Sequence, residues 1–427
     1  MRKLLIAVTL CVMSPVVAMG ALTIEECVKK AEANYPLIRQ YDLLAATCDI
    51  DLSDVGKSWL PRVGLVGQVT AQNVVPAFPE VLTGVLQQMG QQVRGLGKVQ
   101  YKAGVEVSQT LWDGGVSRVR RDIARSRQSV ESAALDVELY TVRQRVENIF
   151  FAILLVEEQI AMNRVTCDLL DNNFEKLKSM YRNGVAMQSD VDMVEAQMLA
   201  LQQTIDCAVA SVAGYRRVLE LFIGESVDGC ALERPVADLP ENTLSARPEL
   251  DLFARRLELN SVSERMCNTD RMPKIGLFVQ AGYGYPGLDY FKSMMNRSMS
   301  FNLISGVTMS WNIDSFYTGN NRHRRSAIEA RRIETDKETF LFNTDMLATS
   351  QSAAIAGLRT AMQNDAKIIA LRGNVRRAAE SQLANGVIDT TGLLTKISDE
   401  NMARLTAGVH EIQLLQEIYR LKYTLNR

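Results

Sequence analysis

Apolar and polar side chains alternate along residues 99–113, which read VQYKAGVEVSQTLWD. The apolar positions of this stretch are Val99, Tyr101, Ala103, Val105, Val107 and Leu111. A period of two predicts a β-strand with one apolar and one polar face. Strands of soluble proteins are usually about half this long, whereas a strand of this length, tilted by about 45°, crosses the hydrocarbon layer of a membrane. The pattern therefore predicts a membrane-spanning strand.

Three further stretches alternate in the same way, at about 60–72, 273–285 and 301–313. The segment between the first two strands, 73–98, contains several prolines and glycines and favours a loop with a short helix. The loop between the last two strands, 286–300, is shorter. Each chain is thus expected to supply four strands.

A very long helix is predicted over residues 117–181. Its apolar residues alternate spacings of four and three, as in a coiled coil: Leu135, Leu139, Val142, Val146, Ile149, Ile153, Val156 and Ile160. The helix is interrupted at residues 183–185 and resumes at Ser189 or Asp190, either of which is expected to cap it, to end near residue 223. A long antiparallel helical hairpin follows from this pattern.

The second half of the chain repeats the first. Pro36 and Pro61 are 25 residues apart, as are Pro248 and Pro273. The strand openings LPRVGL and MPKIGL match, Asp113 corresponds to Asp314, and an N-G-V turn occurs in both halves. Four matches in one order indicate an internal duplication, with a first repeat over 21–244 and a second over 245–427. The first repeat ends in an irregular connector, 224–244.

Helices outside the first hairpin follow the same scheme. Residues 23–57 are expected to form one helix that begins at a capping box of Thr23 and Glu26 and kinks at Pro36. Residues 321–383 form the second long helix, the N-G-V turn at 385–387 ends it, and a last helix runs to about residue 425. The expected fold class is mainly α, with long antiparallel coiled-coil hairpins plus four β-strands per chain.

Four strands cannot close a barrel, and lipid cannot satisfy the hydrogen bonds of open sheet edges. Strands must therefore come from several copies. Three copies, with twelve strands, leave a water-filled bore that suits the polar strand face, whereas eight strands leave an interior filled by side chains. The long helix is roughly 100 Å long at helical rise, enough to extend such a barrel into a tunnel.

Residues 1–20 have the pattern of a signal peptide. Arg2 and Lys3 precede an apolar run from Leu4 to Val17, and Ala18-Met19-Gly20 is a small-x-small cleavage site. A membrane anchor is the alternative, but the apolar run is short for that. The mature chain is expected to begin at Ala21, and Cys11 lies too early to be a lipidation cysteine. The protein is therefore expected to be exported and, if it spans a membrane, to do so with strands.

Over nearly the whole mature chain, the sequence resembles the TolC-like outer-membrane factors of bacterial efflux pumps and type I secretion systems, within the outer membrane efflux protein family. The resemblance rests on LTIEECVKKAEANYP near the start, WLPRVGL and RMPKIGL, SQTLWDGG, and YRNGVAMQSDV at the first hairpin tip. It implies a homotrimer in the outer membrane, with a twelve-stranded barrel and a helical periplasmic tunnel. The partners it implies are outer-membrane lipid, a periplasmic adaptor and an inner-membrane transporter.

The resemblance also assigns partner-binding residues to the hairpin tips. These are Tyr181, Arg182, Asn183, Gly184 and Val185 in the first tip, and Asn385, Gly386 and Val387 in the second. Glycine allows the positive φ of a tight turn, and the valine offers a small apolar contact. The alternative is that N-G-V is turn chemistry only.

Family members often close the tunnel with aspartate rings, but the matching positions in the second tip are Gly392 and Thr395. Asp190 matches in the first tip and is a candidate tunnel-tip residue or a helix cap, and Asp389 lies nearby without being aligned. A gate, if present, is therefore built differently here.

The net charge and the reactive residues of the chain indicate neither a nucleic-acid partner nor a catalytic or metal site. A net charge of −1 favours no polyanionic partner, so nucleic acid is not expected. Neither a catalytic motif nor a metal-ligand or C-x-x-C spacing occurs, so the protein is expected to be no enzyme and to hold no cofactor or metal. His323 and His410 are expected at the surface. The pairing of the six mature cysteines is left open.

Two further features bear on the membrane. Trp112 and Trp311 fall at strand ends, where membrane-interface aromatics belong. An arginine-rich cluster around His323 is either a solvated face or a positive belt that selects against cations or contacts lipid phosphates.

Two functions from different classes fit these features. The first is a passive exit duct, the outer-membrane channel of a tripartite efflux or secretion machine, whose substrate the sequence does not identify. The second is a periplasmic coiled-coil adaptor without a pore. Dependence on detergent distinguishes them, because a barrel requires detergent and a soluble adaptor does not.

Overall fold

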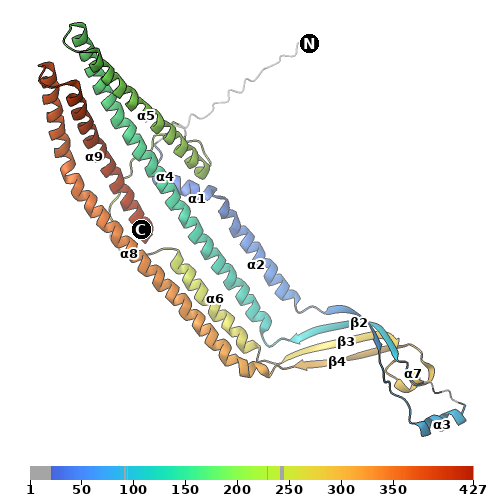
Figure 1. Ribbon diagram of the computed structural model, residues 1–427. Helices are drawn as coiled ribbons and strands as arrows, with labels where there is room; N and C mark the ends of the chain where they lie inside the picture. The colour runs from blue at the N-terminus through green and yellow to red at the C-terminus, as the bar shows by residue number, and fades with distance from the viewer. Residues whose placement is uncertain (1–20, 91–92, 94, 228, 241–244, 427) are drawn as a thin grey trace, which may run out of the picture. The chain divides into compact units, whose positions relative to one another are not determined.

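The computed structural model describes residues 21–426, apart from 91–92, 94, 228 and 241–244. The predicted signal peptide lies outside the described residues. The elements, labelled in Figure 1, are α1 (Ile24–Asn34), the 3₁₀ turn η1 (Pro36–Arg39), α2 (Gln40–Lys57), β1 (Arg62–Ala71), α3 (Glu80–Gln88), β2 (Val99–Trp112), α4 (Val116–Arg182), α5 (Gln188–Ile223), α6 (Glu249–Thr269), β3 (Lys274–Tyr285), α7 (Tyr290–Asn296), β4 (Ser300–Ser310), α8 (Asp314–Ala384) and α9 (Thr390–Leu425). The predicted class, helical hairpins with four strands, is confirmed.

The chain divides into two compact units. Unit 1 contains residues 1–39, 135–248 and 339–427, and unit 2 contains residues 40–134 and 249–338. These units differ from the sequence repeats, because each repeat contributes residues to both. The α4 and α8 helices each pass from unit 2 into unit 1.

The N-terminal helix is broken rather than kinked, which corrects the sequence prediction. The capping box is present, since Glu26 N donates to Thr23 Oγ1 (3.2 Å) and Thr23 N to Glu26 Oε2 (3.3 Å). Tyr35, however, is extended at ψ 128°, and a 3₁₀ turn over Pro36–Arg39 separates α1 from α2. Proline lacks an N–H and disfavours helical backbone in the residue before it, so the helix ends there.

The fourth strand and the second long helix also differ from the prediction. Strand β4 ends at Ser310 and α8 begins at Asp314, seven residues before the predicted start at Asn321. The apolar alternation continues through Trp311 and Ile313, but Ser315 Oγ donates to Asn312 O (2.6 Å), which turns the chain into the helix. The local hydrogen bond of the Ser315 hydroxyl therefore favours the start of the helix, although the alternation of apolar residues continues.

The four strands of unit 2 form one antiparallel sheet in the order β1-β2-β3-β4. Its register pairs Leu65 with Val105, Val105 with Ala281, and Ala281 with Leu303. Directly opposed residues share a face, so the apolar faces predicted separately for each strand form one surface. The short helices α3 and α7, in the connections between β1 and β2 and between β3 and β4, lie at the end of the sheet opposite the strand ends that lead into α4 and α8 (Figure 1).

Unit 1 is built around the predicted helical seam. Five of its eight members are buried: Leu135, Val142, Val146, Ile153 and Ile160. Phe150 and Phe151, which the seam did not include, are also buried, and they pack with residues of α1, α5 and α9. A second cluster joins the two hairpins near their tips, with Leu170, Leu177, Val191, Val194, Ala379, Leu393 and Ile397 at its centre.

None of the helices in the described part of the chain offers the uncharged apolar stretch that a bilayer requires.

Candidate functional sites: the two sheet faces and the hairpin tips

One face of the sheet is apolar and, apart from the buried Tyr285 at the end of β3, largely uncovered within the chain. It carries the odd-numbered residues of all four strands, none of which is charged. Leu65 is 86% exposed, and Val63, Val69, Phe301, Leu303, Val307 and Met309 are exposed too. An exposed apolar surface of this extent marks contact with lipid or with another protein.

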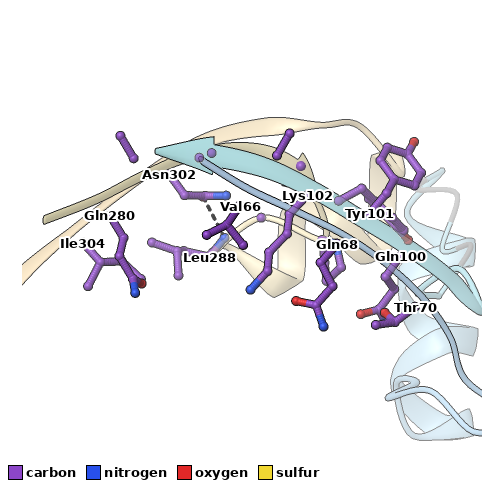
Figure 2. A pocket seen from close by; sticks show the side chains of 18 of the residues that line it. Val66, Gln68, Thr70, Gln100, Tyr101, Lys102, Gln280, Leu288, Asn302 and Ile304 are labelled. Atoms are coloured by element: carbon purple, nitrogen blue, oxygen red, sulfur yellow. Dashed lines mark hydrogen bonds between the residues drawn. The ribbon is translucent and has the colours of Figure 1, made fainter. Parts of the chain in front are cut away.

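The other face is polar and forms a hollow of about 460 Å³ (Figure 2). Figure 2 shows Gln68, Gln100, Lys102 and Gln280 projecting to one side of the sheet. The amide of Gln280 donates to Glu106 Oε1 on the neighbouring strand (3.2 Å). This face is lined mainly by amides, hydroxyls and glycines, which suits contact with water and polar solutes.

Glycines on the polar face allow β2 and β3 to approach each other closely. A Cβ at Gly104 would lie 2.5 Å from the carbonyl oxygen of Ala281, and one at Gly284 would lie 2.7 Å from Lys102 Cα. Side chains at these two positions would push the strands apart.

A β-bulge changes the position of Trp112. Thr110 pairs with Gly276, but the next pair is Trp112 with Ile275, so Leu111 is the extra residue of the bulge. Trp112 therefore lies on the apolar face, 42% exposed, at the helix end of the sheet. The half-exposed Trp311 follows β4 and donates from Nε1 to the carbonyl oxygen of Arg271 (2.9 Å). Their placement at a membrane interface remains a prediction.

The two hairpin tips have the same backbone structure. Val185 N donates to Met180 O (2.9 Å) and Val387 N donates to Gln382 O (2.9 Å), while Gly184 and Gly386 have φ of 73° and 69°. This is the 6→1 hydrogen bond of a Schellman motif, in which glycine takes the left-handed position. The repeated N-G-V sequence therefore ends both long helices by one mechanism.

The side chains of the tips are exposed. Val185 and Val387 are each 70% exposed, and Tyr181 and Met187 are exposed in the first tip only. Arg182, Asn183 and Asn385 are also exposed, and Asn385 Nδ2 donates to Ser381 O (2.8 Å). Each tip thus presents one uncovered valine, and the first adds two larger apolar groups.

Both aspartates near the tips cap helices, Asp190 from inside the first turn and Asp389 from the position before it. Neither Ser189 nor Asp190 is the N-cap of α5, which corrects the sequence prediction, because the helix begins at Gln188. Asp190 lies inside the first turn, and its carboxylate accepts from Met187 N (3.0 Å). Asp389 is the N-cap of α9 and accepts from Gly392 N (2.8 Å). A gate role for either residue stays a prediction.

An ion-pair network behind the second tip escaped the sequence analysis. Glu400 on α9 is buried and accepts from Arg376 of α8 (2.5 Å) and from Arg404 (2.7 Å). Burial alone would raise the pKa of Glu400, but the hydrogen bonds from Arg404 and Arg376 outweigh it and hold the pKa below its usual value. Asp399 pairs with Arg372 nearby (2.7 Å). The contacts of Arg376 with Glu400 and of Arg372 with Asp399 join residues more than 20 positions apart, so no local sequence pattern predicts them, whereas Arg404 lies four residues from Glu400 on the same helix.

Both histidines are partly exposed, and each also contacts a carboxylate, which the sequence did not predict. His323 Nδ1 lies 2.7 Å from Glu264 of α6, and His410 Nδ1 lies 2.9 Å from Asp365 of α8. Arg322 likewise pairs with Asp270, the residue that follows α6, so one arginine of the cluster forms an ion pair while its side chain stays partly exposed. Among the described residues no group of three or more His, Cys, Asp or Glu is placed to hold a metal ion. The six described cysteines are free thiols.

Known proteins share sequence features and the fold of this chain. Residues 28–222 match the family model "outer membrane efflux protein". The outer membrane protein VceC of Vibrio cholerae has a similar structure, with a TM-score of 0.64 and 12% identity over 94% of each chain. The Campylobacter jejuni outer membrane channel CmeC (0.63, 13%) and the open Neisseria gonorrhoeae channel MtrE (0.64, 14%) also match 94% of this chain and 85% and 88% of their own. No curated protein matches the chain in sequence.

Proposed function

We propose that this chain, whose residues 28–222 match the outer membrane efflux protein family model, is the exit duct of a tripartite efflux pump or type I secretion system. In this proposal three copies form a barrel in the outer membrane that continues into a helical tunnel. The duct performs no chemistry, and an inner-membrane transporter supplies the energy.

The observation that carries the proposal is the two-faced sheet. All four strands share one uncharged, exposed apolar face and one polar face. Strands β1 and β4 are the edges of the sheet, and edges in lipid must be paired. Pairing β1 of one copy with β4 of the next would satisfy both edges, turn the apolar face to lipid and enclose the polar face as a lumen.

The hairpin tips are the proposed docking site for a periplasmic adaptor. The α4 helix has 67 residues, which corresponds to about 100 Å, so the tips lie far from the membrane in this arrangement. The exposed Val185 and Val387 then offer paired small apolar contacts on a rigid Schellman turn. A preformed turn costs little conformational entropy when a partner binds.

The first test is mass and shape in detergent, by light scattering and negative-stain imaging. We expect a trimer about 140 Å long, from the long helix plus a membrane-thick barrel. A monomer or compact dimer that stays soluble without detergent would contradict the duct and favour a soluble adaptor.

The docking site is tested by a photo-reactive residue in place of Met187, which is 72% exposed beside the first turn. In cells it should form adducts with a periplasmic protein. Combining V185E with V387E should reduce the adducts by about tenfold, because charge opposes burial of the contact, whereas V185T with V387T should change them far less. Equal adduct yields in both backgrounds, with trimer mass unchanged, would show that the valines do not contact the partner.

A further inference from the structure

The charges on the polar face of the sheet are unbalanced. The even-numbered strand positions carry three basic residues, Arg62, Lys102 and Lys274, and one acidic residue, Glu106, so the net charge is +2 per chain. The apolar face carries none. The whole chain has a net charge of −1, so the positive charge on this face is a local property of the strands.

Lys102 lies where the polar face is hollowed beside a loop. Pro286, Gly287, Leu288 and Tyr290, which follow β3, line the same hollow as Lys102. Figure 2 shows Leu288 and Lys102 on one side of the sheet. Lys102 pairs in register with Gly284, two residues before this loop, and the absent side chain there leaves room for the lysine stem.

The loop is held in place by specific contacts. Leu288 N donates to Asn302 Oδ1 on β4 (3.0 Å), and Gly287 N donates to Ser293 Oγ (3.0 Å), a hydroxyl of α7 that is buried. Contacts with the other loop at this end add support: Tyr285 OH accepts from Gly97 N (2.7 Å), and Arg297 Nε donates to Gly95 O (3.1 Å). The loop is therefore anchored over the polar face.

Of the described side chains that line the hollow, Lys102 and Glu106 are charged at neutral pH. They are four residues apart on β2, about 13 Å at the rise of a strand. Glu106 lies deeper along the strand and is bonded to Gln280, whereas Lys102 is level with the loop. The end of the polar face beside the loop thus carries a positive charge.

We infer that Lys102 and residues 286–288, the part of the loop that follows β3 directly and lines the hollow, form an anion-selective mouth, so that the duct passes anionic solutes in preference to cationic ones. The inference rests on the proposed function, in which the polar face is the lumen. Three copies would place three lysines around one opening, and a ring of like charges is a known way to select ions. Asn302 is the positioning residue, because it holds the loop at the level of the lysines.

The test measures currents through the full-length protein in planar bilayers across a KCl gradient near 0.1 M, where screening is moderate. Wild type should be more permeable to chloride than to potassium. K102Q should lower the permeability ratio PCl/PK by about twofold, and K102E should bring it below one, since ring charge sets the preference. K292Q is the matched control, because Lys292 lies on α7 but does not line the hollow, and it should leave the ratio unchanged.

A second variant tests the loop. N302L removes the acceptor for Leu288 N and should raise conductance while moving PCl/PK toward one. Detergent mass of each variant verifies that it forms the same assembly. Wild-type channels that prefer potassium, or a ratio that K102E does not change, would overturn the inference while leaving the duct intact. Absence of current in every protein, wild type included, would instead contradict the proposed function.

Discussion

At the scale of single residues, the most informative group in unit 1 is a buried carboxyl. Glu147 on α4 is 5% exposed and accepts from Arg143 Nε (3.0 Å). Glu25, Glu32, Lys29 and Tyr419 line the same small pocket. Burial raises the pKa of Glu147 to about 7; Arg143 opposes the shift, and the nearby charges of Glu25 and Glu32 add to it.

This shift predicts that unit 1 loses stability as pH rises. The native state binds a proton that the unfolded state has released, so the stabilising contribution is complete below about pH 4.5 and is lost through about pH 7. E147Q should remove this pH dependence. At pH 8 its free energy of unfolding should exceed that of wild type by on the order of 1–3 kcal/mol, so it should unfold at a higher temperature.

Thermal unfolding of the detergent-solubilised protein at pH 5 and pH 8 measures the difference. E131Q, at an exposed position of the same helix, is the control. If E147Q is no more stable than wild type at pH 8, then the ion pair with Arg143 offsets the cost of burying the ionised carboxylate, and Glu147 does not make stability fall as pH rises.

At the scale of elements, the sheet depends on close approach of β2 and β3. G104A should weaken this pairing by about 1–3 kcal/mol, because its Cβ would lie 2.5 Å from Ala281 O and the backbone must move to relieve the contact. G67A is a matched control, since no atom lies within 4 Å of a Cβ at that position. Heat stability on semi-native gels compares the two, and equal stability would show that the strands can separate at little cost.

Helix ends illustrate how far local sequence reaches. The N-G-V turns, the capping box of Thr23 and Glu26, and the strand faces were all predictable, because each depends on residues within a few positions of one another. The break at Pro36 was underestimated as a kink. The cap of α5 was misplaced, because Asp190 acts from inside the first turn rather than before it.

At the scale of the whole molecule, the proposed membrane placement makes opposite demands on the two faces. L65R puts a charge on the apolar face and should reduce assembly in the outer membrane, since arginine facing lipid costs about 2–4 kcal/mol near the bilayer midplane. Q68R, on the polar face of the same strand, should be tolerated. The amount of heat-resistant protein in outer-membrane fractions provides the measurement. A soluble protein would tolerate both substitutions, because Leu65 is 86% exposed in the single chain.

The sequence by itself determined the strands with their two faces and the shared turn chemistry of both hairpin tips, because periodicity and turn residues act over short distances, and it predicts the duplication. The tertiary structure decided the contacts between residues that are far apart in the sequence. Pairing of β2 with β3 introduced the bulge that moves Trp112 to the apolar face, and packing of α8 against α9 buried Glu400 between two arginines. It also placed the loop after β3 beside Lys102. Register, burial and charge pairing arise only when separate segments meet, and no pattern within one segment encodes them.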